Sequence, residues 1–137
     1  MKALTIFDVS GRAMAAQQVR LNTVASNLAN VMSVSSSPDT VYKPIKPVFE
    51  TQYGSAMGNS GIATVDTVNI SASQAPPEKR YEPNHPLADK DGYIYAPPID
   101  QNAEMVDMIE TSRQYQNNIE VLSTAKTLLL KTINVGK

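Results

Sequence analysis

The chain has 137 residues, of which 42% are hydrophobic and 18% are charged, and its formal net charge is −1. This balance excludes a wholly disordered chain and leaves no basic excess for binding nucleic acid. No apolar run approaches the roughly 20 residues that span a bilayer, so no transmembrane segment is expected, and the first residues lack a signal-peptide pattern. Cysteine is absent, which excludes disulfides and thiolate metal sites.

The first part of the chain predicts one long helix, from about Thr5 to Met32. This segment contains no proline, and its apolar residues recur every three or four positions. Such spacing is typical of the seam of a coiled coil. The residues assigned to this seam are Phe7, Met14, Leu21, Val24, Leu28 and Val31.

The outer face of this predicted helix is almost uncharged. From Ala13 to Pro38 the only charged residue is Arg20, whereas a surface helix usually exposes charges. Amides and small residues take their place, and amides can hydrogen-bond across an interface without desolvating a charge. We therefore expect Asn27 and Asn30 to be interface amides, on a helix that packs against more than one neighbour.

The middle of the chain, residues 33–100, holds all nine prolines and predicts a small β and loop region. Ser33 to Ser37 is expected to be a flexible connector. Two segments have strand composition, and a third follows a tight turn at Asp91-Gly92: residues 41–53, 62–71 and 93–95. The prolines within the first segment favour the edge of a sheet.

The last part of the chain, from about Gln101 to Val135, predicts a second helix of roughly 50 Å. Two prolines precede it, and Asp100 or Asn102 is the candidate N-cap. Large residues again fall seven apart, with an amide and apolar residues beside them. The residues assigned to this second seam and its flanks are Met108, Tyr115, Asn118, Ile119, Leu122, Leu129 and Ile133.

These patterns predict a mainly α chain with a small β region. Residues 1–32 and 101–137 are expected to form a helical assembly domain in which the two helices pair as a coiled coil, connected by the Pro- and Gly-rich segment 33–100. That middle segment is too small to cover two long helices, so other copies of similar chains are the expected partners. An ordinary antiparallel pair, whose helices pack only on each other, is the alternative.

No residue pattern predicts catalysis, and neither a metal nor a cofactor is expected. His85 is the only histidine, and its place between Asn84 and Pro86 indicates a turn or interface residue. A hydrolase built around His85 is an alternative because serines are abundant, although the chain has no Gly-x-Ser-x-Gly motif. The segment Asp89 to Gly92 fails the EF-hand pattern.

Several motifs resemble those of the bacterial flagellar rod, hook and hook–filament junction proteins. The first helix carries Phe7-Asp8-Val9-Ser10-Gly11 and Ser26-Asn27-Leu28-Ala29-Asn30, which are similar to the N-terminal motif of that family. The block from Tyr81 to Asp89, the pair Gly92-Tyr93 and the run from Ser112 to Val121 resemble the proximal rod subunits within it.

The resemblance implies a structural subunit of the flagellar basal-body rod, not an enzyme. Such a subunit polymerises through its terminal helices into a periplasmic drive shaft that transmits torque and surrounds an export channel. The resemblance also implies export through the flagellar type III apparatus without a cleavable signal. The implied partners are copies of itself, the export apparatus, the rod proteins FlgB, FlgF and FlgG, and the rod base adaptor FliE.

The alternative function is a coiled-coil adaptor or chaperone-like component of a secretion system. Such a protein would use the same seams for a different partner. The nearly uncharged first helix counts against it, because a soluble adaptor needs a solvated face.

Overall fold

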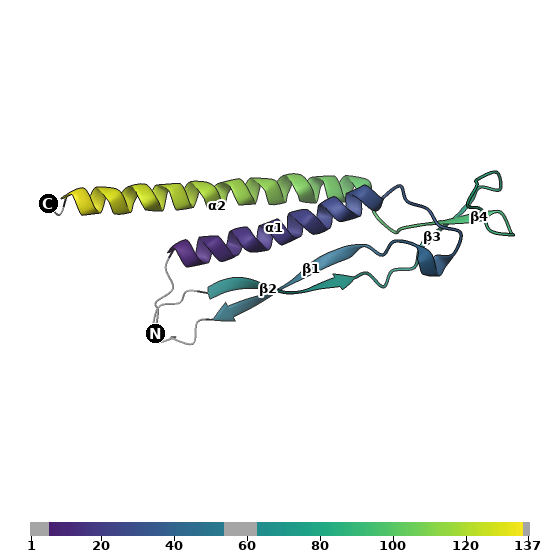
Figure 1. Ribbon diagram of the computed structural model, residues 1–137, viewed down its shortest axis with the longest axis horizontal. Coiled ribbons are helices and arrows are strands. Elements are labelled where there is room, and N and C mark those ends of the chain that lie inside the picture. The colour runs from purple at the N-terminus through teal and green to yellow at the C-terminus, as the bar shows by residue number, and fades with distance from the viewer. Residues whose placement is uncertain (1–5, 54–62, 136–137) are drawn as a thin grey trace.

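The computed structural model describes residues 6–53 and 63–135, and it has two long helices and a small β region, as predicted (Figure 1). Residues 1–5 and 136–137 of the predicted assembly domain lie outside the described residues. The elements in chain order are α1 (Ile6–Asn30), a 3-10 helix (Pro38–Thr40), β1 (Ile45–Tyr53), β2 (Ala63–Ala72), β3 (Glu78–Tyr81), β4 (Tyr93–Ala96) and α2 (Gln101–Val135).

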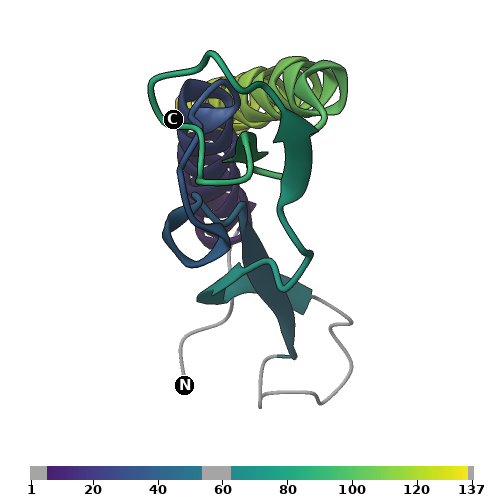
Figure 2. The same cartoon turned by 90° about the vertical axis from the view of Figure 1, so that its right-hand side faces the viewer.

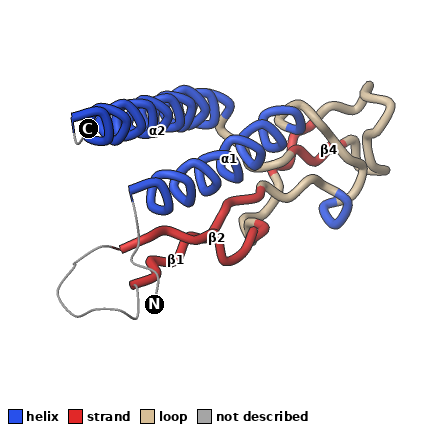
Figure 3. Tube along the Cα trace, turned by 60° about the vertical axis from the view of Figure 1, so that its left-hand side comes forward, coloured by secondary structure: helices blue, strands red, loops and turns tan. Residues whose placement is uncertain are grey.

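Helix α1 lies between α2 on one side and the β1–β2 hairpin on the other (Figures 1 and 2). The two helices run side by side in opposite directions, and the hairpin makes a third layer (Figure 3). Since α2 has 35 residues and α1 has 25, the C-terminal part of α2 extends beyond the start of α1 (Figure 1). The β3–β4 hairpin lies at the opposite end of the helix pair.

The start of α2 is determined by Asp100. Its Oδ1 accepts hydrogen bonds from the backbone N–H groups of Asn102 at 2.9 Å and Ala103 at 3.2 Å. These bonds satisfy two N–H groups that have no partner inside the helix. Of the two candidates, Asp100 is therefore the N-cap, and the predicted bounds of this helix are confirmed.

The β region consists of two antiparallel hairpins. In the first, β1 pairs with β2, with an irregularity between Val48 and Phe49. Pro47 is tolerated within β1 because a two-stranded sheet has only edge strands. In the second hairpin, β3 pairs with β4. The predicted strands at 41–53, 62–71 and 93–95 thus correspond to β1, β2 and β4, with small differences at their ends.

The prediction of a flexible connector at Ser33 to Ser37 is wrong, because hydrogen bonds hold this segment at several points. Ser35 N donates to Tyr95 O at 2.8 Å, and Tyr95 N donates back to Ser35 O at 2.9 Å. Ser37 Oγ accepts from Asp39 N at 3.4 Å and caps the 3-10 helix. The connector therefore ties the end of α1 to β4.

The core of the described chain is small and partly polar. Buried side chains come from α1, α2, β4 and the segment between the 3-10 helix and β1, and several of them are small or polar. They include Ser10, Ala16, Thr23, Val24, Asn27, Val41, Ile94, Ala96, Thr111 and Ala125. Many large apolar side chains, by contrast, are exposed, which marks candidate surfaces for other proteins.

Candidate functional site

Helix α2 presents a continuous stripe of buried and half-buried residues to α1. Its members alternate at spacings of three and four, as in a heptad pattern. We call this set the inner stripe of α2, and it comprises Glu104, Met108, Thr111, Tyr115, Asn118, Leu122 and Ala125.

Polar contacts establish that the two helices run antiparallel. Gln17 Nε2 donates to Gln114 Oε1 at 2.9 Å, and Arg20 forms an ion pair with Asp107 at 3.1 Å. As the residue numbers rise along α1, those of the partners on α2 fall. The Arg20–Asp107 pair is partly exposed, so we expect it to contribute at most about 1 kcal/mol.

The residues predicted for the α1 seam differ in how deeply they lie. Val24 and Asn27 are buried, while Phe7 at the beginning of the helix is exposed. The half-buried members of the predicted set are Met14, Leu21, Leu28, Asn30 and Val31.

The residues predicted on α2 fall into two groups. Four of them lie on the inner stripe against α1: Met108, Tyr115, Asn118 and Leu122. The other three, Ile119, Leu129 and Ile133, are exposed. Leu129 and Ile133 lie in the last turns of α2, and Leu129 lines a groove together with Ile6 and Phe7 of α1.

Asn27 uses all four of its side-chain hydrogen-bonding positions within the chain. Its Oδ1 accepts from Ile45 N at 2.9 Å and from the Tyr42 hydroxyl at 3.1 Å. Its Nδ2 donates to Ile45 O at 2.9 Å and to both carboxylate oxygens of Glu104 at 3.3 Å. Within the chain, the Asn27 side chain joins α1, β1 and α2, and its predicted role at an interface between subunits stays a prediction.

Asn30 acts locally. Its Nδ2 donates to Ser26 O one turn earlier, at 2.8 Å, and Ser26 Oγ lies 3.0 Å from the Tyr42 hydroxyl. The side chains at the end of α1 therefore form one polar cluster with Tyr42, around the point where β1 begins.

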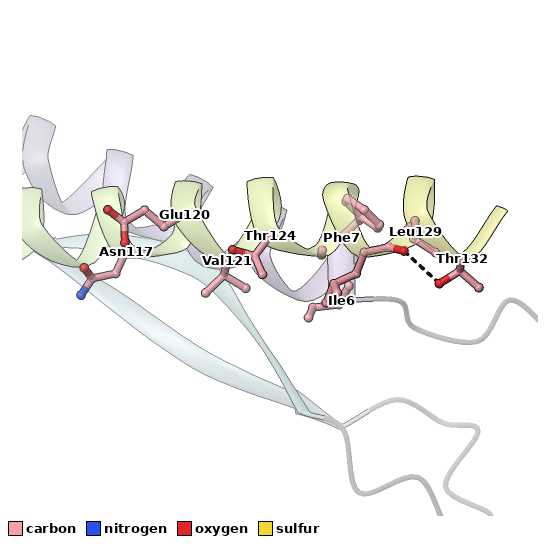
Figure 4. A pocket seen from close by; sticks show the side chains of 10 residues that line it. Ile6, Phe7, Asn117, Glu120, Val121, Thr124, Leu129 and Thr132 are labelled. Carbon is pink, nitrogen blue, oxygen red and sulfur yellow. Dashed lines mark hydrogen bonds between the residues drawn. The ribbon is translucent and has the colours of Figure 1, made fainter. Parts of the chain in front are cut away.

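An apolar groove opens where α2 extends past α1. Ile6 and Phe7 of α1 face the distal part of α2, and the groove between them has a volume of about 810 Å³ (Figure 4). Its other lining residues are Asn117, Glu120, Val121, Thr124, Ala125, Leu128, Leu129 and Thr132. Thr132 Oγ1 donates to Leu128 O at 2.9 Å, so its hydroxyl is satisfied within the helix and its methyl is free to contact an apolar partner.

A second set of exposed apolar residues lies near the beginning of α2, at Met105, Val106 and Ile109. These residues lie outside the inner stripe. Helix α2 therefore has more apolar surface than α1 can cover, at both of its ends. A helix with such a surface normally has a further partner.

The turn before β4 is held by Asp89. Its Oδ1 accepts from Tyr93 N at 2.8 Å and Asp91 N at 2.9 Å, and its Oδ2 accepts from the Tyr95 hydroxyl at 3.1 Å. The hydrogen bond from Tyr93 N is the main cause that lowers the pKa of Asp89 below its ordinary value. These bonds are structural, because every one of them comes from the same turn and strand.

His85 is also part of a turn. Its Nδ1 accepts from Leu87 N at 3.1 Å, and its backbone N–H donates to Glu82 O at 3.0 Å. The prediction of a turn residue is confirmed. Within residues 6–53 and 63–135, no three His, Asp or Glu side chains gather closely enough to hold a metal ion. Neither helix, as far as it is described, is both long and apolar enough to cross a bilayer.

Sequence reasoning missed the small members of the inner stripe. Thr111 and Ala125 are buried against α1, but neither is a large apolar residue. The signal that reveals them is their spacing, because both lie seven residues from Asn118. Small side chains at these positions let two helices approach closely.

The chain is similar along its whole length to known flagellar proteins. It is 42% identical to the flagellar basal-body rod protein FlgC of Salmonella typhimurium and to that of Escherichia coli O6:H1, and 39% identical to that of Yersinia enterocolitica. In each comparison 100% of both chains is covered.

Two family models match the two helical ends. Residues 7–31 match the model described as "Flagella basal body rod protein", and residues 90–135 match "Flagellar basal body rod FlgEFG protein C-terminal". The first match coincides with α1, and the second covers β4 and α2.

Proposed function

This chain belongs to the family of flagellar basal-body rod proteins FlgC, and we propose that it is a structural subunit of the rod, without catalytic activity. The identity of 42% over the full length supports this assignment, in agreement with the resemblance seen in the sequence motifs. The basal body is then its location, and other rod components, including copies of itself, are its partners.

The observation that carries the proposal is the apolar surface of α2 that residues 6–53 and 63–135 leave uncovered. Leu128, Leu129, Leu130 and Ile133 are all more than half exposed, although a monomer gains nothing from exposing them. Full burial of an exposed side chain of this kind is favourable by roughly 1.5–3 kcal/mol, so burying these half-exposed ones against a neighbour contributes about half of that for each. A rod subunit uses this surface, whereas a self-contained helical pair has no use for it.

In the proposed rod, residues 1–32 and 101–137 form the assembly domain, and their helices pair as a coiled coil. The heptad spacing of the inner stripe supports this pairing. The exposed members of the predicted interface are proposed to contact neighbouring subunits: Phe7, Ile119, Leu129 and Ile133. The half-buried members are proposed to contact both the paired helix and a neighbouring subunit. They are Met14, Leu21, Leu28, Asn30, Val31, Met108, Tyr115, Asn118 and Leu122.

The finer parts of the proposal follow from the resemblance to the family. The subunit is exported through the flagellar type III apparatus without a cleavable signal and polymerises in the periplasm around the export channel. Its neighbours there are FlgB, FlgF, FlgG and FliE, and the rod transmits torque. Residues 33–100 form the region outside the helical layer.

Complementation tests the proposed function. A strain that lacks its own gene for this subunit is given the gene for this chain, and both swimming and the protein content of purified basal bodies are measured. We expect swimming to return and the chain to be present in the basal bodies. Swimming that returns without the chain in the basal bodies would instead indicate an adaptor or chaperone.

A further inference from the structure

The two ends of α2 expose pairs of apolar residues with the same spacing. Met105 and Ile109 are 47% and 62% exposed near the start of the helix, and Leu129 and Ile133 are 51% and 62% exposed near its end. The members of each pair are four residues apart and therefore lie on one face. The pairs are 24 residues apart, which is about 36 Å along the helix axis.

The same two ends carry opposite charge. Residues 100–110 include four acidic residues and no Lys or Arg, while residues 121–135 include Lys126 and Lys131 and no Asp or Glu. Asp107 forms an ion pair with Arg20, and Glu104 accepts a hydrogen bond from Asn27. The other two acids have uncharged partners, since Asp100 caps α2 and Glu110 accepts from Gln114. The exposed charges that remain are Asp100 and Glu110 at the start and the two lysines at the end.

From this arrangement we propose that the end of α2 binds the start of α2 of a second copy of this chain. Two copies of the same end repel each other, whereas opposite ends attract and add an apolar contact. In this contact the helices run parallel and staggered, with Met105 against Leu129 and Ile109 against Ile133. Acidic residues of one copy then lie beside lysines of the other.

Such a contact joins two different surfaces, so it does not close on itself and can be repeated along an open assembly. That property suits a rod, and to this extent the inference rests on the proposed function. An antiparallel contact between the same surfaces would bring Ile109 against Leu129, satisfy both ends at once and stop at a dimer.

Engineered cysteines test the parallel contact, because the chain has no cysteine of its own. The full chain carrying Ile109→Cys and Ile133→Cys is concentrated, oxidised and separated on a non-reducing gel. The two positions on one helix are about 36 Å apart, whereas a disulfide needs Cα atoms within about 7 Å. Every disulfide between them must therefore join two chains, and we expect a ladder of dimers, trimers and larger species.

Matched variants identify other arrangements. Gln116→Cys with Ile133→Cys moves one cysteine two turns along the same face, and we expect at least tenfold less cross-linking.

A chain with Ile109→Cys and Leu129→Cys that stops at dimers would overturn the proposal in favour of the antiparallel pair. A chain with Leu4→Cys and Ile133→Cys that closes on itself as a monomer would overturn it as well, since its own N-terminal segment would then occupy the surface.

Electrostatic attraction is tested by adding salt to the same reaction. At 1 M salt the screening length falls to about 3 Å, so the yield of the ladder should fall severalfold. If no ladder forms while the wild-type chain restores swimming in the deletion strain, this inference is rejected and the rod assignment stands. If swimming also fails to return, the proposed function fails with it.

Discussion

Asn27 holds the backbone of Ile45 from both sides: its Oδ1 accepts from Ile45 N and its Nδ2 donates to Ile45 O, both at 2.9 Å. This pair of bonds imitates the pairing of two strands, but one partner is a side chain on a helix. It orients the beginning of β1 on α1, and the same Nδ2 reaches Glu104 in the first turn of α2. One amide thus couples the helix pair to the β region.

Replacing Asn27 with alanine should lower the free energy of unfolding by about 2 kcal/mol, because it leaves several polar groups without their partner. Asn22→Ala is the matched control, since Asn22 is an exposed asparagine on the same helix and alanine is the better helix former. We expect the control to lie within about 0.5 kcal/mol of wild type. Urea unfolding measures both, and equal effects of the two substitutions would contradict the role given to Asn27.

Gly92 should tolerate no side chain. Its φ is +81°, and a Cβ there would lie 3.0 Å from Tyr81 Cε2 and 3.1 Å from Pro83 Cβ. Gly92→Ala should therefore destabilise the β3–β4 hairpin by at least about 1–2 kcal/mol.

Gly11→Ala is the opposite case and serves as the control for Gly92→Ala. Gly11 lies within α1, and a Cβ there would meet nothing within 4 Å. Alanine should stabilise the helix by about 0.5–1 kcal/mol. Thermal unfolding compares the two variants. A stabilising Gly92→Ala would mean that the turn before β4 has another conformation.

The turn at Asp89 should lose stability in acid. Its pKa is lower in the folded chain than the ordinary value of about 3.9, chiefly because Tyr93 N donates to the carboxylate. The charged form is therefore favoured by folding, and its contribution is present above the ordinary pKa and lost as pH falls through the folded pKa.

Asp89→Asn removes this titration and keeps an oxygen that can accept hydrogen bonds. Urea unfolding of wild type and variant is compared from pH 7 down to pH 2. The advantage of wild type should be constant above about pH 5 and shrink below about pH 4. An advantage that grows as the pH falls would contradict the role assigned to this carboxylate.

The sequence predicted the two helices well because their signals are local. Spacing of apolar residues located both, and Asp100 and Asn102 were the candidates for the N-cap of α2, of which the structure uses Asp100. Four residues predicted for the second seam lie on the face of α2 that meets α1: Met108, Tyr115, Asn118 and Leu122. Thr111 and Ala125 of the inner stripe were not predicted, because neither has the large apolar side chain that marks a helix seam in a sequence.

The partners of Asn27 and the connector could not be predicted in the same way. Asn27 binds the backbone of Ile45. Because nearly all residues have the same backbone groups, the sequence does not indicate which of them a side chain will bind. Ser35 likewise pairs with the backbone of Tyr95, which lies 60 residues away. Both contacts arise only when the chain has folded, so residue composition gave no sign of them.

We expect the end of α2 to serve assembly and not folding of the chain. Ala125 and Leu129 are one turn apart on α2, but Ala125 is buried against α1 and Leu129 is exposed. Ala125→Asp should lower stability by at least about 2 kcal/mol, because it places a charge in the helix pair. Leu129→Asp should leave helical circular dichroism and the unfolding midpoint unchanged.

The most direct test is the amount of Leu129→Asp chain incorporated into basal bodies of the deletion strain, measured beside swimming. We predict a folded chain that is absent from basal bodies and cells that do not swim, because the aspartate would bury an unpaired charge only in the assembly. A Leu129→Asp chain that is incorporated at the wild-type level and restores swimming would show that the end of α2 is not an assembly surface.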